Sequence, residues 1–179
     1  MTDDRELWER ILRGDARAFD GFYQQNYSSL FRFIRQLLGS ESAAQDVAQD
    51  IFLRLWQNPN GFQPAKGSLR AYLFGIARNR CAEWWRQWRG PGSTGVAPSA
   101  DPAYEADADQ SALVAQALSR LEPDKRALLW LREVEGQSYG ELAGILKIPI
   151  GTVKSRLFAA REELRRIWSG IGTQEREKP

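Results

Sequence analysis

The sequence from Ser138 to Trp168 is SYGELAGILKIPIGTVKSRLFAAREELRRIW, and its pattern indicates how the carboxy-terminal part of the chain folds. Ser138 and Glu141 stand at the spacing of a capping box, in which a hydroxyl and a carboxylate satisfy free backbone N–H groups. A helix is therefore expected to start at Ser138. Pro149 cannot continue that helix, because it lacks an N–H group and clashes with the preceding turn. The pattern predicts two helices around a tight turn.

The second of these helices combines an apolar face with a basic face. Its apolar residues recur at helical intervals and share one side: Val153, Leu157, Ala160 and Leu164. The other side carries short polar groups, one ring and long cations, namely Thr152, Lys154, Ser155, Arg156, Phe158 and Arg161. Short polar side chains can approach base edges, and long cations can reach phosphates. The pattern favours a DNA-binding helix-turn-helix over a basic helix that is merely solvated.

The composition argues against most classes of enzyme. The chain of 179 residues contains no histidine and has Cys81 as its single cysteine, so no zinc site of nitrogen and sulfur ligands can be assembled. A magnesium site made of carboxylates alone is possible by count, but no clustered acidic pattern with a phosphate-binding loop is present. We expect no enzyme activity, no cofactor and no metal.

The charge distribution and the apolar runs indicate which partners and which compartment suit the protein. The net charge is only +2, but residues 66–89 carry six cations against one acid, and residues 101–109 carry four acids and no cation. Such local fields favour charged partners more than the small net charge suggests. No signal peptide, disulfide pair or apolar run of membrane-spanning length is present. We expect a cytoplasmic protein that does not insert into a membrane.

Nearly every periodic segment has helical spacing, so the expected fold class is all-α. We expect two small helical domains joined by a flexible linker, the second ending in the helix-turn-helix. The linker is rich in Gly, Pro, Ser and Ala before it turns acidic. The expected boundaries are 1–89 for the amino-terminal domain, 90–109 for the linker, 110–170 for the carboxy-terminal domain and 171–179 for a frayed tail. The expected helices before the helix-turn-helix are 6–12, 19–38, 42–57, 68–88, 111–121 and 124–134.

The expected helix 42–57 has an acidic stripe opposite its apolar face. Asp46, Gln49, Asp50 and Leu53 stand at positions i, i+3, i+4 and i+7. Carboxylates that end in an exposed leucine suit docking on a basic protein surface, where charge steers the encounter and leucine adds burial. An ordinary solvated acidic face explains the pattern equally well.

The expected helix 68–88 interleaves aromatic rings, cations and an asparagine. Tyr72 and Asn79 lie seven residues apart and project from nearly the same side. Rings stack on unpaired bases, an amide can read a base edge, and cations pair with phosphates, so the segment suits single-stranded DNA. The alternative is core packing, which is the commoner role of aromatic residues on a helix. Arg80 lies near the apolar stripe, where its stem can pack while its charged head reaches solvent.

Together these segments resemble bacterial RNA polymerase sigma factors of the extracytoplasmic-function (ECF) group. Residues 43–57, AAQDVAQDIFLRLWQ, are similar to the family's core-polymerase-binding helix. Residues 67–86, GSLRAYLFGIARNRCAEWWR, are similar to its promoter-melting helix. Residues 118–165, from LSRLEPDKRALL to AAREELR, resemble its carboxy-terminal DNA-binding domain.

The resemblance implies a protein that binds core RNA polymerase and directs promoter-specific transcription initiation. Polymerase is expected to contact Asp46, Gln49, Asp50 and Leu53. The minus-ten element is expected to contact Phe62, Lys66, Ser68, Arg70, Tyr72 and Asn79. The minus-thirty-five element is expected to contact Thr152, Lys154, Ser155, Arg156, Phe158 and Arg161. The implied partners are core polymerase, promoter DNA and an anti-sigma factor.

One position departs from the family pattern. Lys147 stands in the turn where the family usually has glycine, so either this turn needs no left-handed residue or Lys147 bears strain of about 1 kcal/mol. Two rival classes share parts of the pattern. A freestanding transcription regulator can carry the same helix-turn-helix but has no use for the amino-terminal unit, and a metal-dependent nuclease needs clustered carboxylates.

Overall fold

The computed structural model describes residues 4–88 and 110–176, and within these ranges every regular element is helical. In chain order the elements are α1 (Asp4–Leu12), α2 (Ala16–Leu38), α3 (Glu41–Gln57), the short turns η1 (Pro59–Gly61) and η2 (Pro64–Lys66), α4 (Leu69–Trp88), α5 (Gln110–Ser119), α6 (Pro123–Leu129), the π-helical turn η3 (Trp130–Val134), α7 (Tyr139–Leu146) and α8 (Ile150–Arg176). The predicted all-α class is confirmed. The linker predicted at 90–109 lies outside the described residues.

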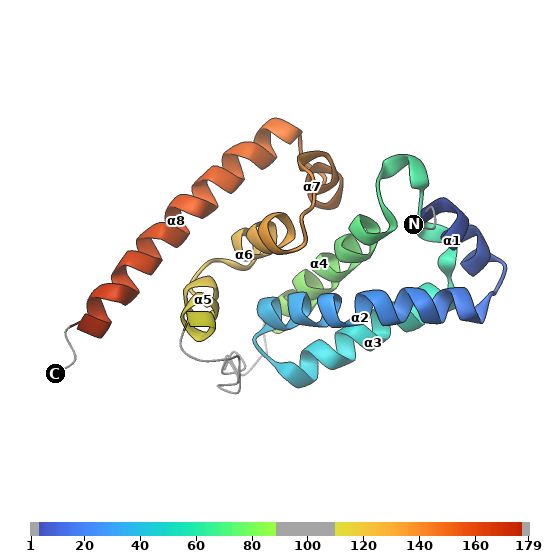
Figure 1. Cartoon of the computed structure of the whole chain (residues 1–179), viewed down its shortest axis with the longest axis horizontal. Coiled ribbons are helices and arrows are strands. Elements are labelled where there is room, and N and C mark those ends of the chain that lie inside the picture. Colours follow the sequence, from blue (N-terminus) through green and yellow to red (C-terminus); the bar gives the residue numbers. More distant parts are fainter. Residues whose placement is uncertain (1–3, 89–109, 177–179) are drawn as a thin grey trace.

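Helices α2, α3 and α4 pack against one another, and α1 packs at one end of α2 (Figure 1). The carboxylate of Asp15 caps α2 by accepting hydrogen bonds from the backbone N–H groups of Arg17 and Ala18. Gly39 ends α2 with a φ of 71°, which glycine adopts without strain. The large side chains between these helices are fully buried, among them Leu30, Phe33, Ile34, Ile51, Leu73 and Phe74.

The helix-turn-helix is formed by α7 and α8. The capping box is complete, because the Ser138 hydroxyl accepts from the backbone N–H of Glu141 and the Glu141 carboxylate accepts from that of Ser138. Lys147 ends α7 with φ 54° and ψ 45°, so the turn does use a left-handed residue and Lys147 bears the strain. The predicted apolar stripe of α8 is buried at Val153, Leu157 and Ala160.

Two boundaries in the carboxy-terminal half correct the sequence prediction. Helix α8 continues to Arg176, so residues 171–176 of the predicted tail are helical. Gly170 does not end the helix, because glycine inside a helix costs only about 1 kcal/mol relative to alanine. The helix predicted at 124–134 divides into α6 and the π-helical turn η3, after which Gly136 has a φ of 70°. The other boundaries lie within three residues of prediction.

The amino-terminal and carboxy-terminal helices also pack directly on each other. Helix α4 contacts α7, and α2 contacts α5 and α6. The buried guanidinium of Arg126 in α6 donates to the backbone carbonyls of Gln36, Ser119 and Leu121 at 2.6–2.8 Å. Helix ends leave such carbonyls without intrahelical partners, so a cation is favourable there. Arg126 therefore ties the end of α2 to the turn between α5 and α6.

Candidate protein-docking and nucleic-acid interfaces

The predicted acidic stripe lies on the outer face of α3. Asp46 and Gln49 are exposed, and the large apolar side chain of Leu53 is 54% exposed. The opposite face of α3 is buried in the core through Ala44, Ala48, Ile51, Phe52 and Leu55. An exposed leucine beside carboxylates is suited to contact with a basic protein surface.

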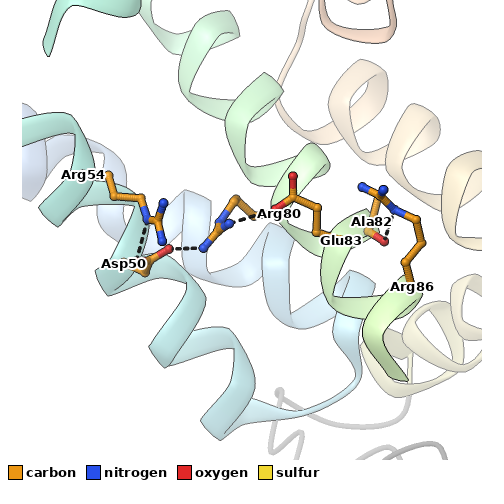
Figure 2. Close-up of polar contacts among 6 residues, drawn as sticks. All are labelled: Asp50, Arg54, Arg80, Ala82, Glu83 and Arg86. Atoms are coloured by element: carbon orange, nitrogen blue, oxygen red, sulfur yellow. Dashed lines mark hydrogen bonds and ion pairs between the residues drawn. The ribbon is translucent and has the colours of Figure 1, made fainter. Parts of the chain in front are cut away.

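Asp50 lies on the same helix, but its carboxylate is already paired (Figure 2). Arg54 Nε donates to Asp50 Oδ1 at 2.8 Å, and Arg80 Nη2 of α4 donates to Asp50 Oδ2 at 2.5 Å. Arg80 Nη1 also donates to Glu83 Oε2 at 2.8 Å. Burial raises the pKa of Asp50, but the hydrogen bonds and charges of Arg54 and Arg80 outweigh it and hold this pKa below its ordinary value. The head of Arg80 is thus paired rather than free in solvent.

A cavity of about 440 Å³ lies between α4, the loop before α4 and helix α7. Its walls include Ala71, Gly75 and Ile76 of α4 and Glu141, Ile145 and Lys147 at α7. Most of the residues predicted for minus-ten DNA line it, namely Phe62, Lys66, Ser68, Tyr72 and Asn79. Arg70 does not line this cavity. The fold therefore gathers five of the six predicted residues around one hollow.

Tyr72 both lines the cavity and packs in an aromatic cluster. Its ring lies 6.2 Å from the ring of Trp8 and 5.5 Å from that of Phe62, measured between centroids. Its hydroxyl lies so close to Gly61 that a Cβ atom at position 61 would collide with it. Phe62 is buried and packs on Trp8 at 5.5 Å. Tyr72 and Phe62 therefore both pack in the core and form a wall of the cavity. Asn79, in contrast, is exposed.

Three polar residues at or near α4 are held by carboxylates of the carboxy-terminal half. Ser68 Oγ donates to Glu141 Oε1 at 2.5 Å, and Arg78 Nη2 donates to Asp124 Oδ1 at 2.9 Å. Arg70 pairs with the buried carboxylate of Glu135 and donates to the side-chain oxygen of Asn26.

Sequence reasoning missed these partners. The three pairs with carboxylates are separated by 46–73 residues in sequence, and no local spacing signals such a contact.

The basic face of α8 is open. Lys154, Ser155 and Arg156 are exposed, and the Phe158 ring is 67% exposed, while Thr152 and Arg161 are partly buried. Arg161 is paired, because its Nε and Nη2 both donate to Glu133 Oε1, at 3.1 and 2.6 Å. This hydrogen bond raises the pKa of Arg161, so the group stays fully charged.

Among the side chains that the structure describes, at 4–87 and 113–170, no group of three or more Cys, Asp or Glu could hold a metal ion. No described helix is both long and apolar enough to span a bilayer. Cys81 is buried in the core, which raises the pKa of its thiol to about 12 and leaves it unreactive.

Comparison with known proteins gives the same assignment for both halves. Residues 22–90 match the family model Sigma-70 region 2, and residues 111–164 match Sigma-70, region 4. The chain is 32% identical to the RNA polymerase sigma-H factor of Pseudomonas aeruginosa, over 92% of this chain and 93% of that protein. It is 30% identical to the ECF RNA polymerase sigma factor RpoE of Cereibacter sphaeroides, over 94% of this chain and 100% of that protein.

Solved structures show the same likeness. The sigma factor RpoE in complex with the anti-sigma factor NepR from Bartonella quintana matches with a TM-score of 0.69 and 26% identity, over 86% of this chain and 98% of that one. CnrH in complex with the cytosolic domain of CnrY matches with a TM-score of 0.72 and 25% identity, over 93% of this chain and 97% of that one. The chain therefore belongs to the ECF group of RNA polymerase sigma factors, which bind core polymerase and direct it to promoters.

Proposed function

We propose that three surfaces of this sigma factor each bind a different partner during transcription initiation. The outer face of α3 docks on polymerase through Asp46, Gln49, Asp50 and Leu53. The cavity beside α4 receives an unpaired base of the minus-ten element, and Arg70 adds a phosphate contact. The basic face of α8 binds the minus-thirty-five element. The observation that carries this assignment is the cavity, where a ring, an amide, a hydroxyl and a cation meet, as capture of an unpaired base requires.

The residues of α8 divide into two roles in this proposal. Ser155 and Phe158 lie at the centre of the exposed face, where they meet base edges and thymine methyl groups. Lys154, Arg156 and Arg161 flank them and bind phosphates, which orient the helix without reading sequence. Thr152 lies at the start of the same face.

The division of the chain is also part of the proposal. Residues 1–89 form the unit for polymerase and minus-ten DNA, and residues 110–170 form the unit for minus-thirty-five DNA. Residues 90–109 connect them, and residues 171–179 follow as a tail. The protein acts in the cytoplasm and catalyses no reaction of its own, because the chemistry of initiation belongs to the polymerase.

An anti-sigma factor is the third proposed partner, beside core polymerase and promoter DNA. Support comes from the similar solved structure of the sigma factor RpoE, which is in complex with the anti-sigma factor NepR. A freestanding regulator would also use α7 and α8, but the exposed Leu53 and the α4 cavity would then have no role.

The direct test is transcription of a genomic fragment library by core polymerase with and without this protein. We expect new start sites that depend on the protein and share two upstream elements. The Asn79→Ala variant should lose these starts and serves as the matched negative control. Binding of upstream DNA without any new start site would instead support the freestanding regulator.

A further inference from the structure

Arg80 connects the docking helix α3 with α4 through an alternating chain of charges. The order is Arg54, Asp50, Arg80 and Glu83, and each neighbouring pair is joined by a hydrogen bond of 2.5–2.8 Å. Figure 2 shows the Arg80 head lying between the carboxylates of Asp50 and Glu83. The contact with Asp50 joins residues 30 positions apart, so it fixes one helix against the other.

The geometry leaves Asp50 able to bind a partner while Arg80 holds it. An ionised carboxylate offers about four acceptor positions, and Arg54 and Arg80 each use one, on different oxygens. The Asp50 side chain is still 34% exposed. A cation of the polymerase can therefore reach the free positions without breaking the pair.

We infer that Arg80 is a positioning residue for polymerase docking: it holds the Asp50 carboxylate in one orientation, so that this side chain does not have to be ordered when polymerase binds. The inference rests on the proposed docking role of Asp50. Side chains that are ordered before binding reduce the entropy lost on association. The benefit therefore falls on the lifetime of the complex with polymerase.

A purely stabilising role is a poor explanation of the pair. Both side chains are about one-third exposed, and ion pairs in contact with solvent contribute little to folding. Arg80 also lowers the local negative charge beside Asp46 and Asp50, which by itself opposes attraction to a basic surface. Loss of Arg80 should therefore not slow the association of the chain with core polymerase, but it should speed up the dissociation of the complex.

The test measures association and dissociation of the full chain with core polymerase for three single variants. Arg80→Met removes the guanidinium but keeps an apolar stem, and Arg80→Lys restores a charged donor. Arg86→Met removes the same charge from the same helix, at a residue whose guanidinium donates to the backbone carbonyl of Ala82 (Figure 2).

We expect Arg80→Met to dissociate about two- to tenfold faster than the wild type. Arg80→Lys and Arg86→Met should dissociate at the wild-type rate. The inference is overturned if Arg80→Met dissociates at the wild-type rate, or if Arg86→Met dissociates equally fast. Transcription starts that depend on the wild-type chain show that the proposed function holds even where this inference fails.

A charge exchange separates positioning from internal bridging. The double variant Asp50→Arg with Arg80→Asp restores an ion pair between α3 and α4 but presents a cation to the polymerase. We expect a thermal midpoint closer to the wild type than that of Asp50→Arg alone, without recovery of polymerase affinity. Recovery of wild-type affinity would show that only the internal bridge matters and would overturn the inference.

Discussion

The ring of Tyr72 packs in the core and also lines the cavity proposed for DNA. Part of the ring packs against Trp8 and Phe62, and the same side chain lines the cavity. An aromatic side chain can do both, because it buries much apolar area and still offers a polar group. Truncation of Tyr72 therefore removes core packing together with any base stacking. Asn79 lines the same cavity and is exposed, so it is the cleaner probe of DNA contact.

Lys147 carries backbone strain that glycine would relieve. Its φ of 54° is costly for a residue with a Cβ atom. We expect Lys147→Gly to raise the free energy of unfolding by up to about 1 kcal/mol, since the strain relieved exceeds the added entropy of the unfolded chain. Urea denaturation measures the change. Lys154→Gly, inside α8, should instead lower the stability by about 1 kcal/mol. A Lys147→Gly variant less stable than the wild type would show that the turn is unstrained.

Helix starts and faces could be predicted from sequence where the signal is local. The capping box at Ser138 and the apolar stripe of α8 involve residues within a few turns of one another, and both are observed. The start of α2 at the Asp15 cap and the π-helical turn η3 were not predicted. Asp15 is not followed by glutamate or glutamine at the spacing of a capping box. The π-helical turn has no local sequence signature.

The closeness of the candidate residues could be predicted from sequence, but their partners could not. Five of the six residues predicted for minus-ten DNA line one cavity, as their shared helix and loop suggest. The pairing of Asp50 with Arg80 depends on how α3 packs against α4, and the contact of Ser68 with Glu141 depends on how the two halves meet. Such contacts arise only from tertiary packing.

At the level of α8, Glu133 neutralises part of the charge that Arg161 would present to DNA in the proposed function. Glu133→Gln should free the guanidinium, so we expect tighter binding to all minus-thirty-five sequences and a salt dependence steeper by up to about one counterion. Binding titrations at several salt concentrations measure both. Glu163→Gln is the control, because it removes the same charge from α8 at a side chain that pairs with Lys125 of α6. A change in base preference without a change in salt slope would contradict this role of Arg161.

In the whole molecule, the carboxy-terminal half forms part of the cavity that we propose for the minus-ten base. Helix α7 forms one wall, and Glu141, Glu135 and Asp124 occupy the donors of Ser68, Arg70 and Arg78. DNA phosphates and these carboxylates seek the same hydrogen-bond donors. In the proposed function, DNA phosphates can use the donors of Ser68, Arg70 and Arg78 only after these contacts with carboxylates break.

The Glu141 contact makes stability depend on pH. Burial raises the pKa of Glu141, but hydrogen bonds from Ser68 and Ser138 outweigh it and hold this pKa below the ordinary 4.5. A lowered pKa stabilises the folded state above the unfolded value, and the contribution is lost as pH falls through the folded value. The thermal midpoint of the wild type should exceed that of Glu141→Gln at pH 7. The difference should shrink below about pH 4.5. A difference that stays constant with pH would exclude this linkage.

Permanganate footprinting of unpaired thymines shows directly whether this chain makes core polymerase open a promoter through the α4 cavity. With core polymerase and the wild-type chain, thymines of the minus-ten element should react, and with polymerase alone they should not. Asn79→Ala should fold normally and bind the closed promoter, yet leave the minus-ten thymines of duplex DNA unreactive. Wild-type reactivity of Asn79→Ala on duplex promoters, or no reactivity with the wild-type chain, would contradict the account.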